Sequence, residues 1–285
     1  MPVKINDLCY TYAPRTPSES EAIKDISLQI KDGSFNAFIG QTGSGKSTLI
    51  QCLNALLIPT SGSVEIDDFI VTSNKRKNKK IKELRKHVGV VFQFPEYQLF
   101  EDTVIKDVAF GPKNFGYSEQ DALSLAKEAL ISVGLDESYF ERSPFELSGG
   151  EKRRAAIAGI LAINPDILIL DEPTAGLDPQ GTEIIMQLID NWHKQGKTII
   201  LVTHDMDLVL KYAENVFVLN RGQLVFSGTP SALFNSDKLD DMSIEIPPLF
   251  TFAKKLKERG FDIDLLKIRF VDDLIEQIAK ECHKI

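Results

Sequence analysis

The most constraining feature of this sequence is a glycine-rich turn between an apolar run and a helix. Residues 35–39 have the pattern of a buried strand, residues 40–47 read GQTGSGKS, and a helix is expected from about Lys46 to Leu57, stopped by Pro59. Because glycine lets the backbone approach a ligand closely, successive N–H groups of the turn can point at one anion. The start of the helix adds partial positive charge there. The turn therefore predicts a phosphate-binding site.

This spacing matches the G-x-x-x-x-G-K-[ST] pattern of the P-loop, in the strand–turn–helix context that the pattern requires. Lys46 is expected to reach the β- and γ-phosphates of a nucleoside triphosphate, and the Ser47 hydroxyl is expected to bind Mg²⁺. A P-loop alone does not distinguish a kinase, a GTPase, a helicase or a transport motor. The residues predicted to surround the nucleotide are Gly40, Gln41, Thr42, Gly43, Ser44, Gly45, Lys46, Ser47 and Thr48.

Short apolar runs alternate with amphipathic helices along most of the chain. The run at residues 167–170 is apolar throughout, which suits a parallel strand covered on both faces. Ser118 is expected to cap a helix whose apolar residues recur with a 3.6-residue period. This order favours an α/β fold with a mostly parallel sheet. The other strands expected downstream are residues 88–92, 198–202, 216–219 and 224–226.

An acidic pair, Asp171 and Glu172, directly follows the expected strand at residues 167–170. Ligands of parallel sheets bind beyond the carboxyl ends of the strands, which places this pair beside the phosphate-binding turn. Asp171 is expected to hold Mg²⁺ directly or through water, and Glu172 to orient and polarise an attacking water. The two motifs together predict a site that hydrolyses a nucleoside triphosphate.

Charge and composition disfavour several classes of protein. Lys and Arg number 33 against 41 Asp and Glu, and the net charge of −8 argues against a nucleic-acid binder that works through bulk electrostatics. No stretch approaches the roughly 18 uninterrupted apolar residues of a membrane span, and no secretory signal is expected at the N-terminus. The three scattered cysteines suit neither a disulfide framework nor a zinc site. The basic run KRKNKK at residues 75–80 is interpreted as a solvated loop.

The motif that selects among P-loop proteins is LSGGE at residues 147–151, which lies 20 residues before Asp171 and opens a predicted helix. Combined with the motifs above, it resembles the signature of ATP-binding cassette (ABC) ATPases, in an order that covers about residues 3–228. The resemblance implies that ATP and Mg²⁺ are the cofactors. It also assigns Gln93 to the Q-loop as a Mg²⁺ contact and His204 as the switch histidine, which is catalytic together with Glu172. Tyr12 is the aromatic residue expected to stack on adenine, and Tyr10 is the alternative.

The implied architecture is that of a P-loop NTPase (RecA-like). An ATPase domain of residues 1–229 would hold a mostly parallel sheet and an ABC helical subdomain at approximately residues 95–163. The pattern changes near Thr229-Pro230, which suit the N-cap and first position of a helix. Two short amphipathic segments follow. Residues 230–285 are therefore expected to form a small α-rich C-terminal module that contacts a dimer partner.

The signature offers N–H groups at the start of a helix, which makes a second anion site. Since the chain already has one phosphate cradle, the second is useful if it closes on the nucleotide of a neighbouring chain, and the ABC family is known for such head-to-tail sandwiches. Glu151 stands where the family usually has Gln, but the spacing from Ser148 to Glu151 is also that of a helix capping box. The residues expected to contact the partner's nucleotide are Ser148, Gly149, Gly150, Glu151 and, in the D-loop, Asp178.

The segment FQFPEYQLF at residues 92–100, with FGPKN at 110–114 and AGLDP at 175–179, resembles the ATPases of energy-coupling factor (ECF) transporters. The second of their two paralogous subunits is the most similar. The resemblance implies import of vitamins or transition-metal ions, driven by ATP hydrolysis. The implied partners are a paralogous ATPase in a heterodimer, a membrane coupling (T) subunit and a substrate-binding membrane (S) subunit, without nucleic acid. The chain is then expected at the cell membrane, peripheral on its cytoplasmic side.

Aromatic and acidic residues are mixed in this segment. We interpret Phe94, Glu96 and Tyr97 as an exposed docking surface, followed by acids at residues 101–102, for a basic amphipathic helix of a partner. The alternative is that Phe94 and Phe100 belong to the core.

Other functions of the ABC class fit less well. DNA-repair and chromosome ATPases carry long coiled-coil insertions, whereas only 125 residues separate Lys46 from Asp171 here, without sustained heptads. A translation factor would need two cassettes in one chain. A scaffold that binds ATP without turning it over is disfavoured by the presence of Glu172 and His204.

Overall fold

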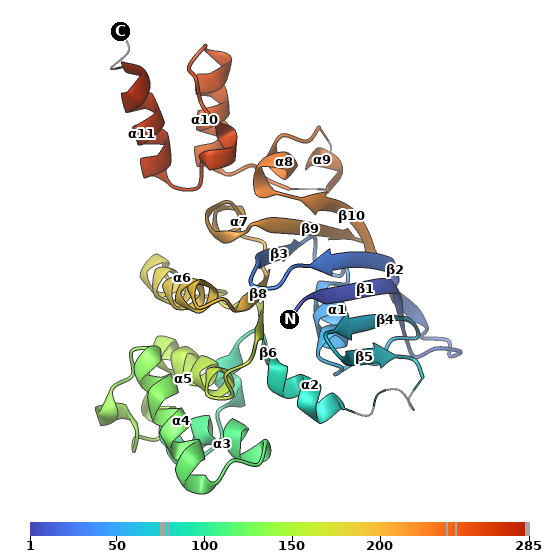
Figure 1. Ribbon diagram of the computed structural model, residues 1–285, viewed down its shortest axis with the longest axis vertical. Helices are drawn as coiled ribbons and strands as arrows, with labels where there is room; N and C mark the ends of the chain where they lie inside the picture. Colours follow the sequence, from blue (N-terminus) through green and yellow to red (C-terminus); the bar gives the residue numbers. More distant parts are fainter. Residues whose placement is uncertain (75–77, 79, 238, 243, 283–285) are drawn as a thin grey trace.

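The computed structural model contains two β-sheets with helices packed around them, and it describes residues 1–74, 78, 80–237, 239–242 and 244–282 (Figure 1). The larger sheet has the strand order β10-β9-β3-β8-β7-β6. The strands from β9 to β6 pair in parallel, and β10 joins β9 antiparallel. The prediction of a mostly parallel α/β sheet is confirmed. The strands are β3 (Phe35–Ile39), β6 (Val88–Val91), β7 (Ile167–Asp171), β8 (Thr198–Val202), β9 (Asn215–Asn220) and β10 (Gln223–Gly228).

A second, antiparallel sheet with the order β2-β1-β4-β5 was not anticipated from the sequence. Its inward-facing side chains, among them Val3, Ile5 and Leu8 of β1, are buried against the first helix and one face of the larger sheet. The two sheets thereby enclose α1 (Lys46–Leu53), as Figure 1 shows. The strands are β1 (Val3–Tyr12), β2 (Ser20–Ile30), β4 (Ser61–Ile66) and β5 (Phe69–Thr72).

Helix α1 ends at Leu53 and not near Leu57, so the predicted C-terminus of this helix is wrong. Asn54 Oδ1 accepts a hydrogen bond from the Leu56 N–H at 3.1 Å, and Ala55 adopts a positive φ of 57°. A short polar side chain that bonds to the nearby backbone competes with helix propagation. The chain therefore leaves the helix before Pro59 can stop it.

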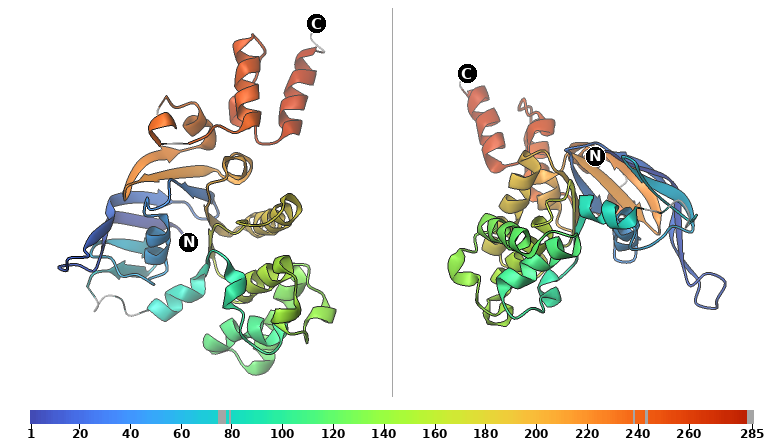
Figure 2. Two further views of the ribbon diagram at one scale, coloured as in Figure 1. Left: turned by 180° about the vertical axis from the view of Figure 1, so that it is seen from behind. Right: turned by 60° about the horizontal axis from the view of Figure 1, so that its bottom comes forward.

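A group of helices lies on the other side of the larger sheet from the antiparallel sheet, as Figures 1 and 2 both show. Ser118 caps α4 by accepting the Asp121 N–H, as predicted. Most of the basic run at residues 75–80 lies outside the described residues. The elements of this part are η1 (Pro95–Gln98), α3 (Val104–Asn114), α4 (Glu119–Ser132), η2 (Glu137–Tyr139), η3 (Pro144–Glu146) and α5 (Gly149–Leu161), whereas α2 (Ile81–His87) buries Leu84 in the hydrophobic cluster that the antiparallel sheet shares.

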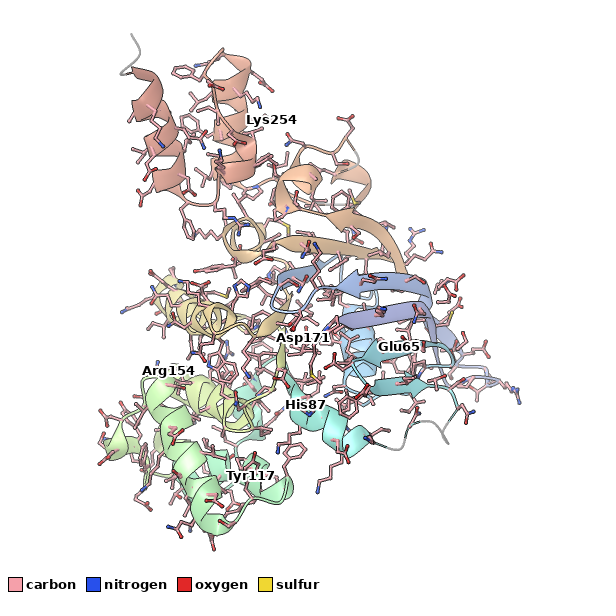
Figure 3. The ribbon with its side chains drawn as sticks, in the orientation of Figure 1. Glu65, His87, Tyr117, Arg154, Asp171 and Lys254 are labelled. Atoms are coloured by element: carbon pink, nitrogen blue, oxygen red, sulfur yellow. The ribbon has the colours of Figure 1, made fainter. Side chains whose placement is uncertain are left out.

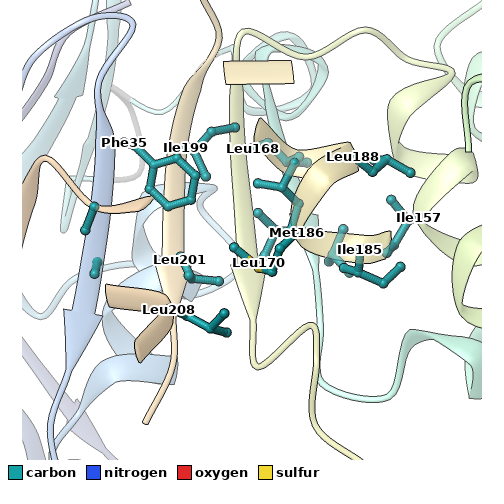
Figure 4. Packing of buried hydrophobic residues seen from close by; sticks show 14 of the residues in the cluster. Phe35, Ile157, Leu168, Leu170, Ile185, Met186, Leu188, Ile199, Leu201 and Leu208 are labelled. Carbon is teal, nitrogen blue, oxygen red and sulfur yellow. The ribbon is translucent and has the colours of Figure 1, made fainter. Parts of the chain in front are cut away.

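The central strands β7 and β8 are buried at every position. In Figure 4, Leu168 and Leu170 of β7 face Ile185 and Met186 of α6 (Pro179–Lys194), and these residues belong to one hydrophobic cluster. Strands covered on both faces hold the residues at their carboxyl ends in fixed positions. Asp171 is at such an end, and Figure 3 places it in the middle of the molecule.

The last part of the chain is helical. After α7 (Met206–Tyr212), Thr229 accepts the Ala232 N–H at 3.2 Å and Pro230 begins the next helix, which confirms the predicted N-cap. Helices α10 and α11 stand side by side at one end of the molecule (Figures 1 and 2). Among the described residues, no helix combines the length and apolarity needed to cross a membrane. The elements are α8 (Pro230–Phe234), α9 (Leu239–Met242), α10 (Pro248–Glu258), η4 (Leu265–Lys267) and α11 (Val271–Cys282).

Candidate nucleotide-binding site

The phosphate-binding turn joins β3 to α1, and its conformation requires glycine. Gly40 has a φ of 143°, and a Cβ there would lie 2.1 Å from the Leu219 carbonyl oxygen. Gly45 has a φ of 104°, and its Cβ would lie 2.6 Å from the Ala22 carbonyl oxygen. Any larger residue would therefore both strain the backbone and collide with a neighbouring strand.

The predicted residues converge on one pocket of about 530 Å³ at the carboxyl ends of the parallel strands. Gly40 and Gln41 line an adjoining hollow of about 300 Å³ that shares Lys46, Glu172 and His204 with the pocket. Ser44 lines neither hollow and is buried under the turn. The predicted residues that line the main pocket are Tyr12, Thr42, Gly43, Gly45, Lys46, Ser47, Thr48, Gln93, Asp171, Glu172 and His204, and sequence reasoning missed Ser20, Glu21 and Ala22.

Lys46 provides the positive charge at the centre of the turn. Its Nζ donates hydrogen bonds to the carbonyl oxygens of Gly40 at 2.6 Å and Gln41 at 3.0 Å. Burial lowers the pKa of Lys46, and the carboxylates of Glu172 and Asp171 partly oppose that change. A cation that is partly removed from water attracts phosphate more strongly than an exposed one.

Ser47 and Asp171 form a pair at the predicted metal position. The Ser47 hydroxyl donates to Asp171 Oδ2 at 3.1 Å. Burial raises the pKa of the Asp171 carboxyl, and the hydrogen bond from Ser47 partly opposes this shift. A hydroxyl and a carboxylate are the oxygen donors that Mg²⁺ prefers, and Gln93 lines the same pocket. The residues present therefore fit a magnesium ion.

Glu172 and His204 lie together at the end of β7 and β8. His204 Nδ1 is 2.9 Å from Glu172 Oε1, and the two side chains are 80% and 15% exposed respectively. The Glu172 backbone has a φ of 51°, a left-handed conformation unusual for this residue type, and its N–H donates to the Val202 carbonyl. The chain thus turns a carboxylate into the pocket. That carboxylate can accept a hydrogen bond from a water, and the histidine can hold its orientation.

Of the two aromatic residues considered for adenine stacking, Tyr12 is the one that lines the pocket. It is 40% exposed, and its hydroxyl is 3.1 Å from Thr48 Oγ1. The rival Tyr10 packs edge-on against Tyr12 with ring centroids 4.8 Å apart and does not line the pocket. The geometry favours Tyr12 for stacking and Tyr10 for supporting its ring.

The signature forms the predicted capping box at the start of α5. Glu151 Oε2 accepts the Ser148 N–H at 2.7 Å, and the Tyr139 hydroxyl donates to Glu151 Oε1 at 2.8 Å. These hydrogen bonds lower the pKa of Glu151 to about 2. None of the described signature residues lines the nucleotide pocket of the same chain. Asp178 also lies outside it, where it caps α6 by accepting the Gly181 N–H.

Glu151→Gln is expected to lower the urea midpoint of unfolding near neutral pH and to do so less in acid. Glu151 binds its partners in the ionised form, so its contribution to stability is complete above the ordinary carboxyl pKa of 4.5. This contribution is lost as the pH falls towards the folded-state pKa of about 2. Unfolding curves of both proteins at pH 7.5, 5.0 and 4.0 test this; a difference that grows with acidity would contradict it.

The exposure predicted for the docking segment is only partly confirmed. Phe94 is 39% and Tyr97 85% exposed, as expected, and Phe100 is 56% exposed, which contradicts its alternative placement in the core. Glu96, however, is not an exposed acid. Its side chain is 14% exposed, and both carboxylate oxygens accept hydrogen bonds from Arg153, at 2.6 and 3.0 Å. The prediction that Glu96 is an exposed acid is wrong, because an arginine from a distant helix pairs with its carboxylate.

Arg153 itself was missed. It is 3% exposed and lies one and two helical turns before the buried Ile157 and Leu161 of α5. A charged residue on the buried face of an amphipathic helix is unusual and is almost always paired. The position of Arg153 in this periodic pattern was the signal that could have identified it.

Comparisons with known proteins agree with this site. The ABC transporter family matches residues 23–175. The chain is 52% identical, over 270 residues, to a protein of Streptococcus pneumoniae serotype 2 (strain D39) named energy-coupling factor transporter ATP-binding protein EcfA2, covering 94% of this chain and 96% of the relative. It is also 52% identical over 269 residues to the protein of the same name from Streptococcus pyogenes serotype M5 (strain Manfredo), with the same two coverages.

Two solved structures are similar in fold and sequence. CbiO1 of Clostridium perfringens, described as part of the ABC transporter complex cbiONQ, has a TM-score of 0.72 and 37% identity over 90% of this chain and 95% of its own. A dimeric post-hydrolysis state of the ATP-binding cassette MJ0796, bound to ADP and Pi, has a TM-score of 0.71 and 32% identity over 80% of this chain and 98% of its own. With the pocket above, these similarities show that the chain belongs to the ABC transporter ATPases, among the ATP-binding subunits of energy-coupling factor transporters.

Proposed function

We propose that this chain is the ATP-hydrolysing subunit of an ECF importer for vitamins or transition-metal ions and works peripherally on the cytoplasmic side of the cell membrane. The observation that carries this proposal is the 52% identity, over 94% of the chain, to relatives named as ECF transporter ATP-binding proteins. The convergence of Lys46, Asp171 and Glu172 on one pocket supports it. ATP hydrolysis is the work of this family, and the cargo follows from the resemblance to ECF ATPases.

Within the pocket we assign the following roles. Lys46 and the backbone of the turn bind the phosphates, and Tyr12 stacks on adenine. Ser47, Asp171 and Gln93 would hold Mg²⁺, which would supply positive charge to neutralise the phosphates. Glu172 takes a hydrogen bond from the attacking water, and His204 keeps the Glu172 carboxylate oriented. The distances of 3.1 Å from Ser47 to Asp171 and 2.9 Å from His204 to Glu172 support these assignments.

We further propose that the complete site forms between two chains. In this assignment the start of α5 contacts the partner's ATP through the N–H groups of Gly149 and Gly150 and the Ser148 side chain, because the Ser148 and Glu151 N–H groups already donate within the capping box. Asp178 would approach the same interface. This assignment is supported by the exposure of Ser148 and by the fact that Ser148 does not line the chain's own pocket. Because Glu151 is held by Ser148 and Tyr139, its charge faces its own chain more than the partner's phosphate.

The proposed partner chain is a paralogous ATPase, giving a heterodimer that docks on the T subunit beside the S subunit. Residues 1–229 would form the ATPase domain, with the helical subdomain near residues 95–163. Residues 230–285 would form the module that contacts the paralogue. Support for this module comes from its exposed apolar side chains, since Phe252 is 54%, Leu266 73% and Ile275 55% exposed.

Affinity purification from membranes tests this assembly. A tagged chain should retain a second, non-identical ATPase and at least two membrane proteins in detergent, and chemical cross-links should join α10 or α11 to the second ATPase. Recovery of the tagged chain alone or as a homodimer, with or without added ATP, would contradict the proposed heterodimer.

Tyr97→Ala should weaken retention of the membrane subunits by about tenfold without affecting ATP binding. Tyr97 is the most exposed aromatic of the docking surface, and burying one aromatic ring at an interface contributes about 1–3 kcal/mol. Ile131→Ala, at an apolar residue of α4 that is 57% exposed, serves as the control. Equal retention of the membrane subunits by both variants would place docking elsewhere. Glu96→Lys is unsuitable here because it breaks the pair with Arg153.

A further inference from the structure

Arg153 joins three segments that are far apart in the sequence. It lies in α5, three residues after the signature glycines end at Gly150. Its Nε and Nη2 donate to the two oxygens of Glu96, at 3.0 and 2.6 Å. Its Nη1 donates to the carbonyl oxygens of Ala175 at 2.6 Å and Pro173 at 3.3 Å. A planar guanidinium has five N–H donors and can make all four hydrogen bonds at once, whereas a lysine has only three donors.

Arg153 also contacts the docking surface. The Arg153 guanidinium lies over the Phe94 ring, with its carbon 5.7 Å from the ring centroid. Phe94 has a φ of 54°, a left-handed conformation that must be held by its surroundings. Burial raises the pKa of the Glu96 carboxyl, but hydrogen bonds and charge from Arg153 outweigh it, so the pKa is lowered and Glu96 stays ionised. The pair is therefore an ion pair between a buried arginine and a half-buried glutamate.

Each segment that Arg153 holds adjoins a residue of the proposed reaction. Pro173 directly follows Glu172, and Ala175 lies three residues after it; the Glu172 backbone is also left-handed, with a φ of 51°. Phe94 directly follows Gln93, which lines the nucleotide pocket. Arg153 lies in the helix of the signature and directly contacts both the docking surface and the turn that carries Glu172.

We propose that Arg153 is a positioning residue for ATP hydrolysis. By holding the carbonyls of Pro173 and Ala175, it fixes the turn that aims the Glu172 carboxylate into the pocket. By holding Glu96 and Phe94 at the same time, it ties that turn to the surface on which the membrane subunits dock. This inference rests on the proposed role of Glu172. A displacement of the docking surface would be transmitted by the Arg153 side chain to the Glu172 carboxylate.

A purely structural ion pair is the competing explanation. Arg153→Met would leave the half-buried Glu96 carboxylate without its arginine, which lowers stability whether or not catalysis is affected. The double variant Glu96→Gln/Arg153→Met removes the unpaired charge as well. It restores stability on either explanation, but it does not restore the hydrogen bonds to Pro173 and Ala175. The two roles of Arg153 are thus separable.

The experiment measures kcat, the KM for ATP and the melting temperature of the purified, assembled transporter. Arg153→Met is expected to lower kcat by about 30-fold or more, with KM within about twofold, because a small misplacement of a catalytic group is enough for such a loss. The double variant should recover most of the melting temperature while its kcat stays low. Arg85→Met is the matched control, since Arg85 also donates to two backbone carbonyls, those of Asn54 and Ala55, away from the pocket.

Recovery of kcat to within threefold of the wild type in the double variant would overturn the proposal and leave Arg153 a structural residue. A rise in KM with kcat unchanged would overturn it as well. If the wild-type assembly itself released no phosphate, the hydrolase assignment would fail instead, and that result is distinguishable because it precedes any comparison of variants.

Discussion

Glu172→Gln is expected to reduce phosphate release by the assembled complex at least about a hundredfold, while ATP affinity stays within about twofold. A glutamine side chain has nearly the same shape but is a much weaker acceptor for the proton of an attacking water, and a lost general base costs about 10²–10⁴-fold. The His204 ring can still bond to the amide, so the geometry of the pocket is preserved. Phosphate release at saturating ATP and nucleotide titration together measure the two quantities.

The matched control is Glu183→Gln. Glu183 lies on the adjacent helix α6, where it bonds only to Gln187 among the contacts described, and it does not line the pocket. Its substitution should leave turnover unchanged. Equal turnover by Glu172→Gln and the wild type would remove Glu172 from the reaction and would leave the pocket as a binding site. The scaffold hypothesis would then regain support.

Residues whose environment is set by local sequence were predicted well. The turn from Gly40 to Ser47 needs only its own spacing and the neighbouring strand and helix to specify a phosphate cradle. The capping box of Ser148 and Glu151 likewise depends on two residues of one helical turn. The acids at the end of β7 could be placed because parallel strands present their carboxyl ends at one edge of the sheet.

The antiparallel sheet was missed because its pairing partners are distant. β1 pairs with β2 and also with β4, so Val3 lies opposite both Ile30 and Ile66. Alternating buried and exposed positions along β1 carried a signal with a two-residue period. That signal is interrupted by register shifts between Ile5 and Leu8, which break the alternation. Such a strand is identified only when its pairing with strands distant in the sequence is known.

The error at Glu96 has the same origin. Its neighbours in the sequence are aromatic and acidic. No feature of this segment predicts that Arg153, 57 residues away, donates hydrogen bonds to the Glu96 carboxylate. The charge of a surface therefore cannot be counted from the sequence of one segment. In this chain the docking surface therefore lacks the exposed Glu96 carboxylate that was predicted, and Arg153 lies beneath it. The exposed face that remains around Phe94 and Tyr97 is more aromatic than predicted.

Lys46→Ala is expected to weaken ATP binding by at least about a hundredfold. The backbone N–H groups of the turn remain, but the ammonium is the positive side chain described in the pocket, and burial strengthens its interaction with phosphate. A loss of this size is about 2.7 kcal/mol. It should also abolish the rise in melting temperature that ATP gives the wild type, since a ligand stabilises only the state that binds it.

Lys24→Ala is the control for general positive charge near the site. Lys24 pairs with Glu21 of the pocket rim at 3.2 Å, yet it does not itself line the pocket. ATP should therefore stabilise this variant as it does the wild type. If ATP still raised the melting temperature of Lys46→Ala as much as that of the wild type, the backbone of the turn alone would be sufficient to bind ATP. Together with Glu172→Gln, the comparison separates holding the nucleotide from cleaving it, because the first variant loses both steps and the second only cleavage.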